Sequence, residues 1–201
     1  MSFNRLRIVM AKLGRVGLMA WGLWLGLGIP ALALPGQTRS QVAAWIQGNA
    51  TLRPQPGEQL VVHRTDTPAR RFTFRASVFP PTGVPGALVL NKIRSEQILL
   101  VDIIDGVSKT RLEESLRRIY GADILRDYEQ AERVLLYPSA ETPAYTNQYL
   151  VIQGELFVGD RFAYWVELTS DTRGRIETGR ITLLLQEDAP ALANFLSGGV
   201  R

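Results

Sequence analysis

Three consecutive β runs near the C-terminus constrain the fold of this chain more than any other sequence feature. They span residues 149–158, 161–169 and 175–186. Gly159-Asp160 forms a two-residue turn between the first two runs, and such short turns join antiparallel neighbours. The pattern therefore predicts a three-strand antiparallel meander. In the middle run, one face collects four large apolar side chains: Phe162, Tyr164, Val166 and Leu168.

The rest of the chain combines β runs with helical segments. The run 97–104 is nearly all apolar, which is typical of a strand covered on both faces. Thr110 and Glu113 have the spacing of a capping box, which marks a helix start. Residues 122–137 stay ambiguous, because their first part suits a helix and 133–137 suits a short strand. Further β runs are expected at 59–65 and 71–79, and helices at 41–47, 110–120 and 190–196.

This order of elements predicts an α+β fold. Runs of strands separated from helices favour an antiparallel β-sheet with helices beside it, rather than alternating parallel units. The expected architecture is an antiparallel β-sheet with a C-terminal three-strand meander and two to four helices packed mainly on one face. We expect residues 34–201 to form a single domain, which is long enough to bury one substantial core.

The first 33 residues have the three-part organisation of a secretory signal peptide. An apolar run at 16–29 follows the basic start, and Ala31 and Ala33 form a small-x-small exit after Pro30. The pattern predicts export by the general secretory route and cleavage after Ala33. The basic start contains no acidic residue and four basic ones: Arg5, Arg7, Lys12 and Arg15.

An uncleaved membrane anchor is the alternative interpretation of residues 1–33. No charge occurs between Arg15 and Arg39, and about 20 apolar residues suffice to span a bilayer. Pro30 and Pro35 interrupt this stretch, which favours the signal peptide. Under both interpretations the body is exported, into a periplasm or a thylakoid-type lumen, and only the N-terminal segment would contact the membrane.

Composition and charge exclude several classes of site. The 201 residues include no cysteine and one histidine, which excludes disulfides, thiolate zinc sites, cysteine nucleophiles and sites that need two histidines. Four of the 23 basic residues and none of the 19 acidic residues precede Leu34, so the remaining chain is neutral overall. A neutral domain gives no general electrostatic reason to bind nucleic acid. No cofactor or metal motif is present.

Two polar residues are candidates for chemistry. His63 lies in the run 59–65, and histidine is a common general base, yet no pattern supplies a nucleophile or an orienting group for it. Asp102 lies within the apolar run 97–104, where a carboxylate needs a partner. We expect an arginine salt bridge there, with a catalytic carboxylate as the alternative. Asp105 is expected to point to the opposite face and to serve the turn before Gly106.

Basic residues gather around the first two β runs. Arg71 and Arg75 alternate with Phe72 and Phe74, which predicts buried rings and a solvated basic face. The functional alternative is a docking patch for an acidic partner or for lipid headgroups. The candidate patch consists of Arg64, Arg70, Arg71, Arg75, Lys92 and Arg94.

These observations lead to three hypotheses. The first is an exported, non-enzymatic envelope domain that binds another protein or assists an assembly, without nucleic acid. The second is a small exported hydrolase that uses a carboxylate such as Asp102, and a pocket holding Asp102 or His63 beside other polar groups would favour it. The third is a carrier of an apolar ligand, which a large apolar pocket between sheet and helices would favour.

Overall fold

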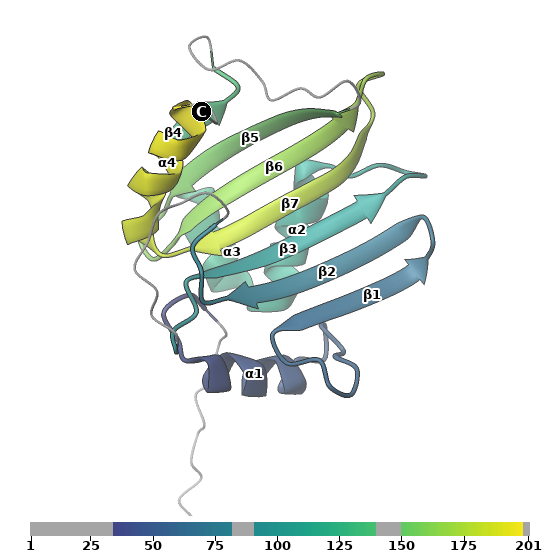
Figure 1. The fold of residues 1–201 in the computed structure, drawn as a ribbon, viewed down its shortest axis with the longest axis vertical. Helices are drawn as coiled ribbons and strands as arrows, with labels where there is room; N and C mark the ends of the chain where they lie inside the picture. Colours follow the sequence, from purple (N-terminus) through teal and green to yellow (C-terminus); the bar gives the residue numbers. More distant parts are fainter. Residues whose placement is uncertain (1–33, 82–90, 140–149, 199–201) are drawn as a thin grey trace, which may run out of the picture.

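The computed structural model describes residues 34–81, 91–139 and 150–198, so the predicted signal segment lies outside the described residues (Figure 1). The strands are β1 (Val61–Thr67), β2 (Arg70–Ser77), β3 (Ser95–Asp102), β4 (Glu132–Tyr137), β5 (Leu150–Val158), β6 (Ala163–Asp171) and β7 (Ile176–Leu184). The helices are α1 (Arg39–Gly48), α2 (Lys109–Tyr120), α3 (Ala122–Glu129), the short 3-10 helix η1 (Gln186–Asp188) and α4 (Ala189–Ser197).

The described strands form one antiparallel sheet in the order β1-β2-β3-β7-β6-β5-β4. The meanders β1–β3 and β4–β7 meet where β3 pairs with β7, and Ile98 lies opposite Ile181 at that seam. This architecture confirms the predicted α+β fold with its antiparallel sheet and C-terminal meander. Residues 122–137 contain both of the elements that the sequence left open, since α3 is followed directly by β4.

Helices α2 and α3 cover one side of the sheet, which we call the helix face (Figure 1). Leu112, Leu116 and Ile119 recur at helical spacing along α2 and are buried in the main core. The helix starts at Ser108, whose hydroxyl accepts the Arg111 N–H at 3.3 Å. The capping box predicted at Thr110 is therefore wrong, because a serine two residues earlier already serves as the cap.

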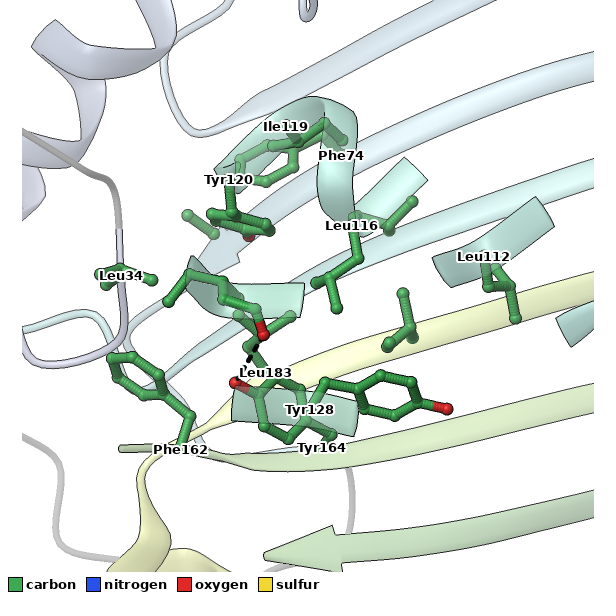
Figure 2. Packing of buried hydrophobic residues seen from close by; sticks show 14 of the residues in the cluster. Leu34, Phe74, Leu112, Leu116, Ile119, Tyr120, Tyr128, Phe162, Tyr164 and Leu183 are labelled. Carbon is green, nitrogen blue, oxygen red and sulfur yellow. Dashed lines mark hydrogen bonds between the residues drawn. The ribbon is translucent and has the colours of Figure 1, made fainter. Parts of the chain in front are cut away.

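Aromatic residues join α1 and α2 to the sheet. Trp45 of α1 stacks on Tyr120 with ring centroids 5.9 Å apart, and Phe74 of β2 lies 6.4 Å from Tyr120. Figure 2 shows Phe74, Tyr120 and Ile119 gathered at one end of the core, with Tyr128 beside Tyr164 further along the sheet. Such pairs stabilise a core beyond the area they bury.

Helix α4 packs on the opposite side of the sheet, which we call the second face, at the end formed by β4–β7 (Figure 1). Leu192 of α4 joins Leu156, Trp165 and Leu184 in a smaller apolar cluster. The Trp165 ring occupies the space of a Cβ at Gly154, only 2.1 Å from where that atom would lie. A glycine is thus required there by packing.

The loop between β5 and β6 corrects the turn predicted at Gly159-Asp160. Strand pairing ends at Val158 opposite Ala163, and one further bond runs from the Gly159 N–H to the Phe162 carbonyl oxygen at 2.9 Å, so the turn centres on Asp160 and Arg161. The carboxylate of Asp127 in α3 accepts the backbone N–H groups of Arg161 and Phe162, at 3.0 and 3.3 Å. These two donors are therefore satisfied by a helix side chain instead of by continued strand pairing.

Candidate functional site: an arginine-lined cleft

A cleft opens on the helix face between the strands β1–β3 and helix α2. Its volume is about 660 Å³, within the range of roughly 300–1,000 Å³ that ligand sites occupy. We call it the arginine cleft. Its lining comprises Ala50, Thr51, Arg53, Arg64, Asp66, Arg70, Arg71, Phe72, Leu100, Val101, Arg111, Glu114, Ser115, Arg118 and Ile119.

Strand register assembles the floor of the cleft. Arg64 of β1 lies opposite Phe72 of β2, which in turn lies opposite Leu100 of β3. Directly opposite residues point to the same side of a sheet, so all three belong to the helix face. Phe72 and Leu100 are half-buried, and Ile119 of α2 adds a third apolar side chain to the lining.

Arg64 contradicts the prediction that the arginines of this hairpin share one solvated face. Its guanidinium carbon lies 4.5 Å from the centroid of the Phe72 ring, a cation–π contact. The alternation inside β2 does separate Arg71 and Arg75 from the phenylalanines. It does not apply to Arg64, because that residue comes from the neighbouring strand and pairs with Phe72 across it.

One wall of the cleft is organised by the buried carboxylate of Asp102, which is 1% exposed. Its Oδ2 lies 3.3 Å from Arg70 Nε and 3.0 Å from Arg111 Nη1. Its Oδ1 accepts the N–H groups of Asp105 at 2.9 Å and Ile104 at 3.1 Å. The Asp105 N–H foremost, then the Arg111 guanidinium and the Ile104 N–H, lower the pKa of Asp102 to about 2.

Asp102 therefore has the expected arginine partner, and two arginines contact it instead of one. Asp105 differs from the prediction, because Arg70 contacts both Asp102 and Asp105. The strand ends at Asp102, and the turn that follows returns Asp105 towards the same guanidinium. Among the described residues, no group of three or more acidic, histidine or cysteine side chains is placed to hold a metal ion.

Arg64 is the cation of the cleft that no carboxylate neutralises. Its Nη1 donates to the Thr51 carbonyl oxygen at 2.7 Å, and its Nε is buried without a hydrogen-bond partner. It is half-buried, yet it forms no ion pair with any described residue. The other described arginines of restricted exposure each contact a carboxylate: Arg70, Arg94 and Arg180.

The remaining charges of the lining are largely compensated. Glu114 Oε1 lies 2.7 Å from Arg118 Nη2, and Arg70 and Arg111 share the carboxylate of Asp102. Arg53 is exposed and forms no ion pair with described residues. Its φ of 49° is unusual for a residue other than glycine, asparagine or aspartate. Arg53, Arg64 and Arg71 are thus the lining cations that form no ion pair with described residues, and Arg64 is the half-buried one among them.

The predicted docking patch does not assemble as one surface. Arg64, Arg70 and Arg71 contribute to the lining of the arginine cleft, although Arg71, like Arg75, is exposed at a β2 position that alternates onto the second face. The structure places the last two candidates elsewhere. Lys92 is exposed beside the start of α1, in a bridge with Thr38.

Arg94 was expected on a docking surface and is instead buried, with 9% of its surface exposed. Its Nε donates to Asp188 Oδ2 at 3.1 Å, and its Nη2 lies 3.2 Å from Glu187 Oε1. The prediction is wrong because η1, distant in sequence, packs its carboxylates against this guanidinium.

His63 is exposed on the second face. Its Nδ1 lies 3.1 Å from the hydroxyl of Thr73 across the β1–β2 pair, and its backbone N–H donates to Glu58 Oε1 at 2.8 Å. It lies outside the arginine cleft, so the structure does not bring together the two polar candidates, His63 and Asp102.

Sequence reasoning missed Arg53, Arg111 and Arg118 as members of a site. Arg118 pairs with Glu114 along α2, a contact at i,i+4 spacing that ordinary helix support explains. Arg53 lies in a segment that has the composition of a linker. No local signal identifies these residues, because the cleft forms from segments far apart in the sequence; Thr51 and Arg118, for example, are 67 positions apart.

A second, smaller cavity of about 350 Å³ opens beside β4, β5 and β6. Its apolar lining includes Leu136, Val166 and Leu168, and the ion pair between Lys109 and Glu155, at 2.6 Å, lies at its wall. It is the feature among the described residues that corresponds best to the predicted apolar-ligand site.

Comparison with protein-family models, with curated proteins and with solved structures finds no match for this chain. Among the described residues, no helix combines the length and apolar character that a membrane span needs. A function for this chain is therefore inferred from the chemistry of the arginine cleft.

Proposed function

We propose that this protein is an exported, non-enzymatic domain that binds an acidic segment of another envelope protein in the arginine cleft. The observation that carries the proposal is that Arg64 is half-buried and forms no ion pair with described residues. A cation removed from water without a counter-charge is costly, and a carboxylate of a partner offsets that cost. The volume of the cleft suits a few side chains of a partner.

The state of the polar candidates supports binding over catalysis. A general base must be free to accept a proton from a substrate. Asp102 is occupied by two arginines and two backbone N–H groups, and its lowered pKa makes it a weak base. His63 lies on the other face of the sheet, away from the cleft.

The exported location rests on the signal-peptide pattern of residues 1–33. A structural detail supports cleavage after Ala33: Leu34, the next residue, is buried in the main core with 6% of its surface exposed (Figure 2). Cleavage at this point would leave in the exported chain every core residue that the structure describes.

Binding of a labelled acidic peptide tests the proposed function. The protein isolated from the envelope should bind a peptide that carries several glutamates and leucines, measured by fluorescence anisotropy. Binding should weaken with added salt, since partly exposed charges are screened. Replacing Arg53 and Arg64 by alanine should weaken it by at least about tenfold, or roughly 1.4 kcal/mol.

The matched control is the double replacement of Arg75 and Lys92 by alanine, which removes the same charge from two exposed residues outside the cleft lining. It should retain binding. Equal loss in both double variants would mean that the peptide senses only overall charge, and the cleft proposal would then be wrong. Absence of any binding to the unmodified protein would have the same consequence.

The intact mass of the native protein tests its location. Soluble and membrane envelope fractions would be measured separately. A soluble species that starts at Leu34 supports cleavage and a free exported domain. A membrane-bound species that retains residues 1–33 supports the anchor, and a full-length species found only in the cytoplasm would overturn export.

A further inference from the structure

The arginine cleft has features that specify its ligand more closely than an acidic segment. We propose that it recognises a single carboxylate attached to a short apolar group, with Arg64 binding the carboxylate above the apolar floor. This inference rests on the proposed function, because it names the ligand chemistry of the same cleft. It depends on the charges of the cleft lining, on the N–H groups of Arg64 that have no described partner, and on the apolar side chains of the cleft floor.

The charge balance favours a ligand with one negative charge. Arg70 and Arg111 already contact the carboxylate of Asp102, and Arg118 contacts Glu114. Asp66, which also lines the cleft, repels additional negative charge. A dianion such as phosphate would need several free cations around one point. Arg64 is the free cation above the apolar floor, since Arg53 is exposed and Arg71 occupies a β2 position that alternates onto the second face.

The contacts of Arg64 leave donors that suit a carboxylate. Its Nη1 uses one N–H on the Thr51 carbonyl oxygen, and the Phe72 ring supports the guanidinium from one side. The second N–H of Nη1 and both N–H groups of Nη2 form no hydrogen bond with described residues. Guanidinium N–H groups match the two oxygens of a carboxylate in a paired arrangement. Because two contacts already hold the guanidinium, little side-chain freedom remains to be lost on binding.

The floor of the cleft accounts for the apolar part of the ligand. Phe72 and Leu100 are half-buried and lie directly opposite each other across β2 and β3. Ile119 joins them in the lining from α2. An apolar group next to the carboxylate would cover the exposed parts of these side chains and exclude water from the ion pair, which strengthens it.

Two sources present this chemistry. One is the C-terminal residue of a polypeptide, whose free carboxylate adjoins an apolar side chain such as leucine. The other is a free aliphatic acid of similar size. Both place one carboxylate a few bonds from an apolar group, and the experiment separates them.

Isothermal titration calorimetry of the protein isolated from the envelope tests the inference with defined probes. Hexanoate and an acetylated tripeptide ending in free leucine should bind. Hexanamide and the same tripeptide with an amidated end should bind at least about tenfold more weakly, because the charge is absent. The tighter of the two carboxylates identifies the source.

Variants assign the binding to Arg64. Arg64→Ala should abolish carboxylate binding, and Arg64→Lys should weaken it by about tenfold, because lysine keeps the charge and loses the paired donors. Arg75→Ala on the second face is the control and should bind like the unmodified chain. Thermal unfolding of each variant establishes that it is folded, and Arg64→Lys keeps the test valid if the alanine variant fails to fold.

Four outcomes would overturn the inference. Inorganic phosphate binding more tightly than hexanoate would indicate a dianion site, and equal binding of hexanoate and hexanamide would indicate a purely apolar one. Binding of the glutamate-rich peptide without either monocarboxylate would overturn this inference and leave the proposed function standing. Failure of every probe, that peptide included, would overturn both.

Discussion

At the scale of single residues, Glu96 is the most unusual side chain of the core. It is fully buried on the helix face, opposite Ala76 and Leu183. Its Oε2 accepts the Tyr120 hydroxyl at 2.6 Å, and its Oε1 has no partner among the described residues. Burial raises the pKa of Glu96 from 4.5 to about 7. The folded chain therefore keeps this carboxyl protonated in mildly acidic solution.

We expect Glu96 to make stability fall as the pH rises from about 4.5 to about 7. In that window the folded state binds a proton that the unfolded state releases, so raising the pH favours unfolding. Glu96→Gln removes this dependence and should be the more stable form at pH 8, by up to about 3 kcal/mol. Urea unfolding at pH 5 and pH 8 measures the effect.

Glu114→Gln is the control for this prediction, because the Glu114 side chain is partly exposed to solvent and pairs with Arg118. It should keep the pH dependence of the unmodified chain. The same dependence in Glu96→Gln would show that another group causes it.

At the scale of elements, Asp102 connects the end of β3 to the start of α2. The same carboxylate binds Arg70 of β2 and Arg111 of α2 and shapes the turn between the two elements. Asp102 thereby fixes the distance between α2 and the strands β2 and β3, and with it the width of the arginine cleft. The ion pairs of the cleft wall thus join β2, β3 and α2, whereas Arg64 takes no part in them.

We expect Asp102→Asn to destabilise the fold at neutral pH and to make it less sensitive to acid. The folded pKa of Asp102, about 2, lies below its ordinary value of 3.8. Its contribution to stability is therefore complete above about pH 4 and is lost as the pH falls towards 2. Thermal unfolding at pH 7 and pH 2.5 should show a difference at the first pH that shrinks at the second.

Asp105→Asn provides the comparison, since the Asp105 side chain is 61% exposed and its ion pair within the described residues is with Arg70. Its effect at pH 7 should be small, as for other exposed pairs. A larger loss from Asp105 than from Asp102 would contradict the assignment of Asp102 as the centre of the cluster.

At the scale of the whole molecule, the two meanders depend on long-range contacts to stay together. The β3–β7 pairing is one of these, and the buried pair of Arg94 and Asp188 is another. Arg94 precedes β3, and Asp188 ends η1 and stands at the residue before α4. The pair thus holds the last helix of the described chain to the strand where the two meanders meet.

We expect Arg94→Met to destabilise the fold by about 3 kcal/mol, because it leaves the carboxylate of Asp188 buried without its partner. Glu187→Gln should cost much less, since Glu187 is 67% exposed and is the outer contact of the same guanidinium. Chemical denaturation of the two variants measures both. Equally small losses of stability in both variants would mean that water reaches the Asp188 carboxylate and that its ion pair with Arg94 contributes little to stability.

The sequence predicted the elements well wherever one face is apolar and the other polar. Alternation in the C-terminal runs identified β5, β6 and β7, and the helical period of Leu112, Leu116 and Ile119 identified α2. Its errors are local. The start of α2 was misplaced because serine and threonine are equivalent caps in a pattern, and the turn at Gly159 was misjudged because Asp127 binds that loop from another element.

The candidate site was only partly predictable. Basic residues near the first hairpin were noticed, and an arginine partner for Asp102 was expected. Which arginines share a surface depends on strand register and on the neighbours that fold against them. The sequence placed Arg94 and Arg64 in the same candidate basic patch. In the structure, η1 buries Arg94 and neutralises its charge. Arg64 instead contacts the Thr51 carbonyl oxygen and the Phe72 ring.

The sequence by itself determined the α+β class, the antiparallel C-terminal meander and the alternation of apolar and polar faces, because these depend on residues close together along the chain. Only the tertiary structure decided that β3 pairs with β7, that Asp102 lies between two arginines, and that Thr51, Arg64 and Arg118 meet around one cleft. Contacts between distant segments depend on how whole faces of the sheet and helices pack against one another. A pattern of neighbouring residues in the sequence does not determine that packing.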